Sequence, residues 1–421
     1  MQLQLRTVLN HVHPLKSFVY ADVRLLPRVG TSAARIEARV EPRKNGRPCC
    51  AKCRRPGSTY DHQPLREFKF VPLWGVLVFL LYEPRRVECR QCGIHVEMMP
   101  WAAGKSPMAT VYMSFLATWA RRLSWTETGR AFAASWDEVF RAVTWVVVYG
   151  LLHRSLDGIQ AIGVDEIAYR KGHKYLTLVY QIDASCRRLL WITERRTEKS
   201  IESFFTWLGK RRSQALRVVC SDMWKPYLKI IRRHAGQALN VLDKFHIVAH
   251  LNKAVDETRR RDAADLRRHG DEVTLKHTRW CLLKRPANLT MKQAGRLRGL
   301  LRVNLRTVRA YLLKEDFEHF WNYVSPTWAG KFLDRWCNTA MRSGIAPMKS
   351  KAKMLRSHRD LILNYFRAKK EYSSSIVEGF NTKVKLVTRK AFGYRKDDTI
   401  KIALFHALGR LPEPEHAHRF A

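Results

Sequence analysis

The stretch from residue 160 to 245 alternates strand and helix signals in an order that strongly restricts the fold. Three apolar or alternating runs come first, "QAIGVDEI", "YLTLVYQID" and "RLLWITE", and runs of this kind predict strands. A helical segment, the strand "LRVVCSD", a second helical segment and the strand "LNVLDKF" follow. Strands that alternate with helices in this way predict a sheet covered by helices.

Acidic residues close two of these predicted strands. Asp165 ends "AIGVD" and Asp222 ends "VVCSD". The order of three strands, helix, strand, helix and strand is that of an RNase H-like α/β unit, in which the first and fourth strands are neighbours. The two carboxylates would then meet at one edge. Mg²⁺ prefers oxygen ligands, and two such ions about 4 Å apart would activate a water or 3′-hydroxyl and stabilise the leaving oxygen.

A two-metal site needs a third acid, and the candidate is Glu378 in "SSSIVEGFNTKVKLVTRKAFGYR". Ser375 and Glu378 also have the spacing of a capping box, and spacing alone leaves the two uses evenly matched. One helical face carries a polar and basic series that suits a metal and a phosphate backbone, namely Glu378, Asn381, Lys385 and Arg389. The alternative acids are Glu166, Asp183 and Asp243. Glu166 would face away from Asp165, because side chains alternate along a strand.

Paired cysteines near the N-terminus predict a metal site. "PCCAKC" supplies Cys50 and Cys53, and "VECRQCG" supplies Cys89 and Cys92. Two such turns complete a tetrahedral Zn²⁺ site, and four protein ligands leave no open position, which predicts a structural role. Cys49 competes with Cys50 as a ligand. The alternative is two unrelated pairs of buried thiols.

The segment "LSWTETGRAFAASWDEVFRAVTWVV" predicts two short helices joined by a tight turn at Ala133 and Ala134. Each helix begins with a capping box, Ser124 with Glu127 and Ser135 with Glu138. This is the spacing of a helix-turn-helix, whose second helix, from Trp136 to about Val147, would enter a major groove. The candidate DNA contacts are Ser135, Trp136 and Arg141. The alternative is a helical hairpin inside a core.

The charge balance indicates a polyanionic partner. Lys and Arg total 77 against 37 Asp and Glu, a net charge of +40 spread along the chain, and each neutralised phosphate adds affinity by releasing counterions. A merely basic soluble surface and a membrane-surface protein are the alternatives. The longest apolar run, Val71 to Tyr82, is shorter than the roughly 20 residues of a membrane helix. We therefore expect no membrane partner and a cytoplasmic, nucleoid-associated protein.

Residues 251 to 370 have helical character, many basic residues and no strand signals, which predicts an all-helical insertion. The insertion contains four tryptophans that could contact phosphates or flipped bases, although a core role is favoured. These are Trp280, Trp321, Trp328 and Trp336.

From about residue 48 to 410 the chain resembles the DDE transposases of bacterial insertion sequences, specifically the ISL-three family. The matching stretches are "CAKC…CRQCG", "LSWTETGRAFAASWDEVFRAV", "IGVDEIAYRKGHKYLTLVYQID", "CSDMWKPY", "LDKFHIVAHLNKAVDETRR" and "SSSIVEGFNTKVKLVTRKAFGYR". The resemblance implies that Asp165, Asp222 and Glu378 form a catalytic triad that binds Mg²⁺ or Mn²⁺. Asp243 and His246 match a further family motif, and the alternatives for them are orienting a metal ligand, orienting a DNA phosphate or packing. Arg54 stands where the family pattern has a glycine after the second cysteine.

These observations together predict a multidomain α/β protein. The domains would be a zinc-binding domain (1–104), a helix-turn-helix (105–157), an RNase H-like catalytic domain (158–250), its all-helical insertion (251–370) and its C-terminal helices (371–421). We expect a transposase that binds the terminal inverted repeats of its element as a homo-oligomer, cuts double-stranded DNA and joins the ends to target DNA. The alternatives are a DNA-binding regulator with an inactive nuclease-like body and a structure-specific nuclease.

Overall fold

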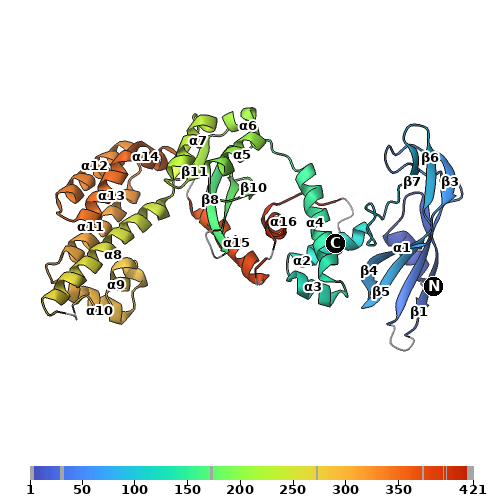
Figure 1. The fold of residues 1–421 in the computed structure, drawn as a ribbon, viewed down its shortest axis with the longest axis horizontal. Helices are drawn as coiled ribbons and strands as arrows, with labels where there is room; N and C mark the ends of the chain where they lie inside the picture. The colour runs from blue at the N-terminus through green and yellow to red at the C-terminus, as the bar shows by residue number, and fades with distance from the viewer. Residues whose placement is uncertain are drawn as a thin grey trace. The chain divides into compact units, whose positions relative to one another are not determined.

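The chain folds into two compact units (Figure 1). The computed structural model describes residues 4–28, 33–170, 174–271, 274–371, 374–391, 393–394 and 396–414. The first unit combines Met1–Ser155 with Val387–Ala421, and the second is Leu156–Leu386. The chain thus leaves the first unit, builds the second and returns.

The first unit joins two sheets to a group of helices. Its strands are β1 (Phe18–Leu26), β2 (Arg35–Pro42), β3 (Ser58–His62), β4 (Arg66–Leu73), β5 (Val76–Tyr82), β6 (Arg85–Cys89) and β7 (Gly93–Val96). Its helices are α1 (Leu5–Val12), α2 (Thr110–Ala120), α3 (Trp125–Ala131), α4 (Trp136–His153) and α16 (Asp397–Leu408). One sheet has the order β1-β2-β5-β4 and the other β3-β6-β7. The apolar run from Val71 to Tyr82 lies in β4, a turn and β5.

One hydrophobic core fills the first unit. Trp101 is 1% exposed and its ring lies edge-on to Phe18 and Tyr82, with centroids 4.9 and 5.2 Å away. Along β5 the last residues alternate between buried and half-buried, as expected for a strand with one face in a core. Helices α2 and α4 extend the same core, and Ala403 of α16 belongs to it.

The second unit is built on a five-stranded sheet with the order β10-β9-β8-β11-β12. The strands are β8 (Ala161–Arg170), β9 (Lys174–Ile182), β10 (Arg187–Glu194), β11 (Val218–Ser221) and β12 (Leu239–Leu242). Neighbours among β8, β9 and β10 run antiparallel, whereas β11 runs parallel to both β8 and β12. The first and fourth strands of the unit are therefore paired.

Helices cover both faces of this sheet (Figure 1). On one face, α5 (Glu198–Leu208) and α7 (Lys225–Ala235) share a core with Val164 and Val179. The short α6 (Lys210–Gln214) follows α5 and leads to β11. On the other face lies α15 (Ser374–Lys390). There the rings of Tyr180 and Phe380 stack with centroids 4.6 Å apart.

Between β12 and α15 the described residues form helices and no strand. They are α8 (Lys244–Arg268), α9 (Arg279–Leu283), η1 (Pro286–Asn288), α10 (Met291–Leu300), α11 (Arg306–Glu318), η2 (His319–Asn322), α12 (Pro326–Arg342), α13 (Ala346–Ser357) and α14 (Arg359–Arg367). Trp321 and Trp336 are buried in their shared core, but Trp280 and Trp328 are more than half exposed. The preference for a core role thus holds for two of the four tryptophans.

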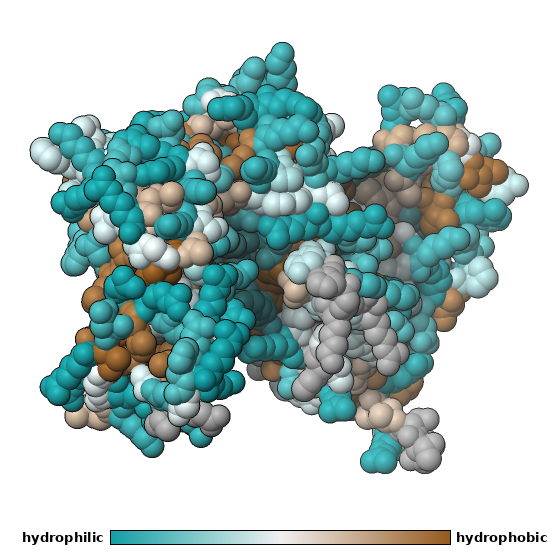
Figure 2. Space-filling model, turned by 60° about the vertical axis from the view of Figure 1, so that its left-hand side comes forward, coloured by the Kyte–Doolittle hydropathy of each residue, from teal (hydrophilic) through white to brown (hydrophobic). Residues whose placement is uncertain are grey.

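The prediction of a mixed α/β chain with more than one folding unit is confirmed. Within the described residues, no helix combines the length and apolar character that a bilayer crossing requires. Hydrophilic residues cover most of the face seen in Figure 2.

Candidate active site and metal centre

The register of the parallel strands brings Asp165 and Asp222 to the same level of the sheet. Gly163 of β8 pairs with Cys220 of β11, and each aspartate follows two residues later. Because neighbouring parallel strands stay in step, Asp165 and Asp222 lie at the same level of the sheet. Asp165 was expected to end its strand, but β8 continues to Arg170, so Asp165 lies within β8. Asp222 comes directly after its strand, and its side chain is 10% exposed.

Asn381 links helix α15 to Asp165 of β8 and to Tyr180 of β9. Its amide nitrogen donates to Asp165 Oδ2 over 2.5 Å, and its carbonyl oxygen accepts from the Tyr180 hydroxyl over 3.0 Å. Glu378 lies three residues earlier, so it stands on the same side of the helix as Asn381. Glu378 is exposed. The side chain of Ser375, expected to form a capping box with it, lies outside the described residues.

Asp222 is held by two donors. The backbone amide of Trp224 donates to Oδ1 over 2.9 Å, and Arg196 Nη2 donates to Oδ2 over 2.8 Å. Arg196 Nε also lies 3.1 Å from Glu166 Oε1, an ion pair by distance whose angle does not make a hydrogen bond. Arg196 thus joins two carboxylates. Nothing in the sequence around Arg196 signals this role.

Adjacent residues of β8 send their carboxylates to opposite faces. Asp165 bonds to α15, whereas Glu166 meets Arg196 and is close to Tyr227 on the face covered by α7. Burial raises the pKa of Glu166 to about 7. Burial also raises the pKa of Asp165, while hydrogen bonds from the Glu166 amide and Asn381 act in the opposite direction. A cation beside Asp165 would offset this desolvation, because a nearby opposite charge favours the ionised carboxylate.

Asp243 extends the row of acids, and Asp183 does not. Val241 of β12 pairs with Cys220, so Asp243 follows its strand at the level of Asp222. It caps α8 by accepting from the Phe245 amide over 2.7 Å, and His246 Nε2 lies 3.7 Å from its Oδ2. Asp183 follows β9, which runs antiparallel to β8. It therefore lies near the amino end of β8, away from Asp165.

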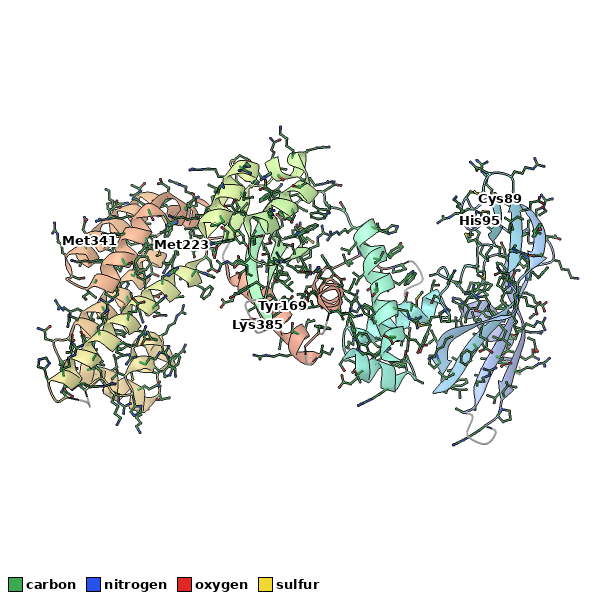
Figure 3. The ribbon with its side chains drawn as sticks, in the orientation of Figure 1. Cys89, His95, Tyr169, Met223, Met341 and Lys385 are labelled. Atoms are coloured by element: carbon green, nitrogen blue, oxygen red, sulfur yellow. The ribbon has the colours of Figure 1, made fainter. Side chains whose placement is uncertain are left out.

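Four cysteines of the first unit form a cluster. The sulfurs of Cys50, Cys53, Cys89 and Cys92 all lie within 4.8 Å of one another, and Cys53 and Cys89 are 3.5 Å apart. Four thiolates around one Zn²⁺ stand about 3.8 Å apart, since Zn–S bonds are about 2.3 Å. Cys49 is outside the cluster, and its thiol lies 3.9 Å from the Arg47 carbonyl oxygen. Figure 3 labels Cys89 at the end of β6.

Each cysteine pair is followed by a residue with a positive φ angle. Gly93 follows Cys92 with φ 78°, and Arg54 follows Cys53 with φ 60°. Arg54 therefore takes the left-handed conformation that a glycine adopts more easily, which explains why the departure from the family pattern leaves the turn intact. The backbone amides of Gln91 and Cys92 lower the pKa of the Cys89 thiol to about 7, which favours the thiolate that a metal requires.

Helices α3 and α4 begin with both predicted capping boxes, Ser124 with Glu127 and Ser135 with Glu138. Ala133 in the turn between them has φ 50°. A residue with a Cβ pays about 1–2 kcal/mol for this conformation. Lys69 offsets the strain, because its ammonium donates to the Ala133 carbonyl over 2.6 Å and lies 3.2 Å from Glu138.

The candidate DNA contacts differ in exposure. Ser135, Trp136 and Arg141 of α4 are exposed, as are Lys385 (labelled in Figure 3) and Arg389 of α15. Asn381 is 9% exposed, with its amide engaged by Asp165 and Tyr180. The position of Asn381 as a link between α15 and the sheet was not anticipated from the sequence.

Comparison with known proteins identifies the family. Residues 162–404 match the ISL3 family model of DDE transposases, which is described as "Transposase". The transposase for insertion sequence element IS1001 of Bordetella parapertussis is 30% identical over 353 residues, 83% of this chain and 85% of that protein. The transposase for insertion sequence element IS1557 of Mycobacterium tuberculosis is 30% identical over 426 residues, 94% of each chain. The chain belongs to the ISL3 (ISL-three) family of DDE transposases.

Proposed function

We propose that Asp165, Asp222 and Glu378 are the catalytic residues of this transposase and that they hold Mg²⁺ or Mn²⁺. The observation that carries the proposal is the pairing of Gly163 with Cys220, which aligns Asp165 with Asp222. The link from Asn381 to Asp165 adds α15, and with it Glu378, to the same edge. The sheet order β10-β9-β8-β11-β12 supports an RNase H-like catalytic domain.

The donor set fits a hard divalent cation. All three side chains offer carboxylate oxygens, which Mg²⁺ and Mn²⁺ prefer over softer ligands. Asp222 uses one lone pair of each oxygen for Trp224 and Arg196, so each oxygen keeps another for a cation. A bound metal pair would supply Lewis acidity to the attacking and leaving oxygens of a phosphodiester.

The residues of the chain then have separate tasks. Asp165 and Asp222, fixed by the sheet, set the place of the reacting phosphate, and α15 presents Glu378 to it. The exposed Lys385 and Arg389 continue along α15 and suit the DNA backbone. Water attack on a phosphodiester releases a 3′-hydroxyl, and attack of that hydroxyl on target DNA joins the strands.

The first unit would recognise the ends of the element. The exposed face of α4, with Ser135, Trp136 and Arg141, suits a major groove. Structural Zn²⁺ on the four cysteines would hold the turns beside β6 and β7 in place. The predicted domains 1–104 and 105–157 would share this task, since one hydrophobic core joins them. Joining two ends needs two copies of the end-binding surface, so we propose a homo-oligomer on DNA.

The test is cleavage and strand transfer on DNA that carries the ends of the element, with Mg²⁺. We expect activity in the wild type, none in Asp165→Asn or Asp222→Asn, and retained end binding in both. Asp360→Asn, an acid whose side chain is 84% exposed in the same unit, is the matched control and should cleave normally. Binding without cleavage by the wild type would favour the regulator. Cuts at junctions whatever the end sequence would favour the structure-specific nuclease.

Glu378→Gln separates catalysis from helix capping. Glutamine serves in a capping box as glutamate does, but it lacks the charge of a metal ligand. We therefore expect Glu378→Gln to unfold at the wild-type temperature and to lose cleavage. Wild-type cleavage by this variant would remove Glu378 from the active site.

A further inference from the structure

Arg196, whose side chain is 37% exposed, contacts two acids at the proposed active site and has no role yet in the proposed chemistry. Its guanidinium lies between Asp222 and Glu166, 2.8 and 3.1 Å away, and both acids are nearly buried, with side chains 10% and 8% exposed. Its central carbon also lies 4.7 Å from the centroid of the Trp224 ring. A cation with three such neighbours has a fixed position.

The backbone that carries Arg196 is fixed as well. Arg195, between β10 and α5, has φ 68°, a conformation unfavourable for a residue with a side chain. Three hydrogen bonds hold it: its amide donates to the Tyr175 carbonyl over 2.8 Å, and its carbonyl accepts from the Thr177 and Ser200 hydroxyls over 2.8 and 3.1 Å. A strained turn kept by its surroundings in this way commonly serves a site.

The charges explain why an arginine can stand beside a metal ligand. A lone guanidinium against Asp222 would cancel the negative charge that a cation needs. Glu166, on the other side of Arg196, supplies a compensating negative charge when it is ionised. The Arg196–Glu166 pair is then neutral, and it offers Asp222 an oriented hydrogen bond without removing its charge. A planar guanidinium suits this task because it presents several donors in a fixed geometry.

We propose that Arg196 is a positioning residue of the metal site, charge-balanced by Glu166, which orients the Asp222 carboxylate for the divalent cation. This rests on the proposed function, since it needs a metal at Asp222. Partners that orient metal ligands in this way typically change metal affinity or activity by about 10–100-fold when removed. Glu166 would thus act in the metal site by balancing the charge of Arg196, although its side chain faces away from Asp165.

The test uses Mn²⁺ alone as the probe, titrated into the DNA-free full chain and followed by the electron paramagnetic resonance of free Mn²⁺. Asp222→Asn is the reference and should abolish the site. Glu166→Gln leaves the charge of Arg196 unbalanced, so we expect Mn²⁺ to bind about tenfold more weakly. In the double variant Glu166→Gln/Arg196→Gln the repulsion is gone, and binding should become tighter than in Glu166→Gln.

Arg196→Gln alone separates orientation from charge. We expect it to lower the cleavage rate at saturating Mn²⁺ about tenfold, with folding checked by circular dichroism. The matched control is Arg233→Gln/Glu202→Gln, an exposed pair 3.1 Å apart in the same unit, which should leave Mn²⁺ binding unchanged.

The outcomes distinguish this inference from the function it rests on. If the wild type has no Mn²⁺ site that depends on Asp222, the proposed metal chemistry fails. If that site exists but Glu166→Gln binds Mn²⁺ like the wild type, or the double variant binds no better than Glu166→Gln, only the role of Arg196 is overturned. A change in unfolding temperature without a change in Mn²⁺ binding would also overturn it.

Discussion

At the scale of single residues, Gly163 decides how closely α15 approaches β8. A Cβ at this position would lie 2.4 Å from Val377 Cγ2, closer than non-bonded carbons come. Val377 is next to Glu378 and is 3% exposed. The missing side chain of Gly163 therefore sets the distance between Glu378 and the sheet that carries Asp165.

We expect Gly163→Ala to push α15 away from β8 and to weaken the contact of Asn381 with Asp165. Overpacking of this kind costs about 1–3 kcal/mol, and cleavage should fall with it because Glu378 is displaced. Thermal unfolding and a cleavage assay with end-bearing DNA measure the two effects.

Gly379→Ala is the matched control on the same helix. A Cβ there meets nothing within 4 Å, so this variant should gain about 0.5–1 kcal/mol from helix propensity. Equal stability and activity of Gly163→Ala and the wild type would show that the close approach does not position α15.

At the scale of elements, the cysteine cluster joins the turn before β3 to the turn between β6 and β7. The sheet β3-β6-β7 is small, and all residues of β3 are exposed or half-buried. It has little apolar surface to bury, so a metal bound at its end would provide much of its stability.

We expect purified protein to contain zinc, and Cys50→Ser to lose it, with a loss of more than about 2 kcal/mol in unfolding free energy. Cys49→Ser, the adjacent control, should keep both zinc and stability because Cys49 lies outside the cluster. Atomic absorption and thermal unfolding measure the two quantities. Loss of zinc in Cys49→Ser with retention in Cys50→Ser would reverse the ligand assignment.

Local signals in the sequence predicted the parts of the site that depend on near neighbours. The capping boxes of α3 and α4, the strand that ends before Asp222 and the two cysteine pairs all follow from short spacings. The strand of Asp165 was predicted too short, because β8 continues to Arg170. Arg196 could not be predicted, because its turn is held by Tyr175 and Thr177 of a different strand. The same holds for the parallel pairing of β2 with β5, which depends on segments that are far apart in the chain.

At the scale of the whole molecule, the first unit is built from both ends of the chain. His406 of α16 is 6% exposed and bonds to the backbone of Ala117 in α2. Ala403 lies in the same core as α2 and α4, and Lys390 donates to the Arg122 carbonyl over 2.6 Å. The segment after α15 therefore completes a core that the N-terminal helices begin.

The buried His406 predicts that the first unit loses stability in acid. Burial lowers the pKa of His406 from 6.5 to about 3. Between these values the unfolded chain binds a proton that the folded chain does not, so stability falls as the pH falls through this window, by up to about 1.4 kcal/mol per pH unit. The contribution of neutral His406 to the stability of the first unit is fully present above pH 6.5. Thermal unfolding from pH 7 to 4 should show this slope in the wild type.

His406→Gln should reduce the slope, whereas His153→Gln, at an exposed histidine of the same unit, should keep it. An unchanged slope in His406→Gln would assign the acid sensitivity to other groups.

The return of the chain to its first unit also sets the order of events during synthesis. A ribosome makes α2, α3 and α4 early, then the whole second unit, and only afterwards α16. While the polypeptide is still being translated, its first unit lacks the helix that completes its core. The nascent chain can therefore fold its second unit before its first unit is finished, and a message truncated before α16 yields a first unit without a complete core.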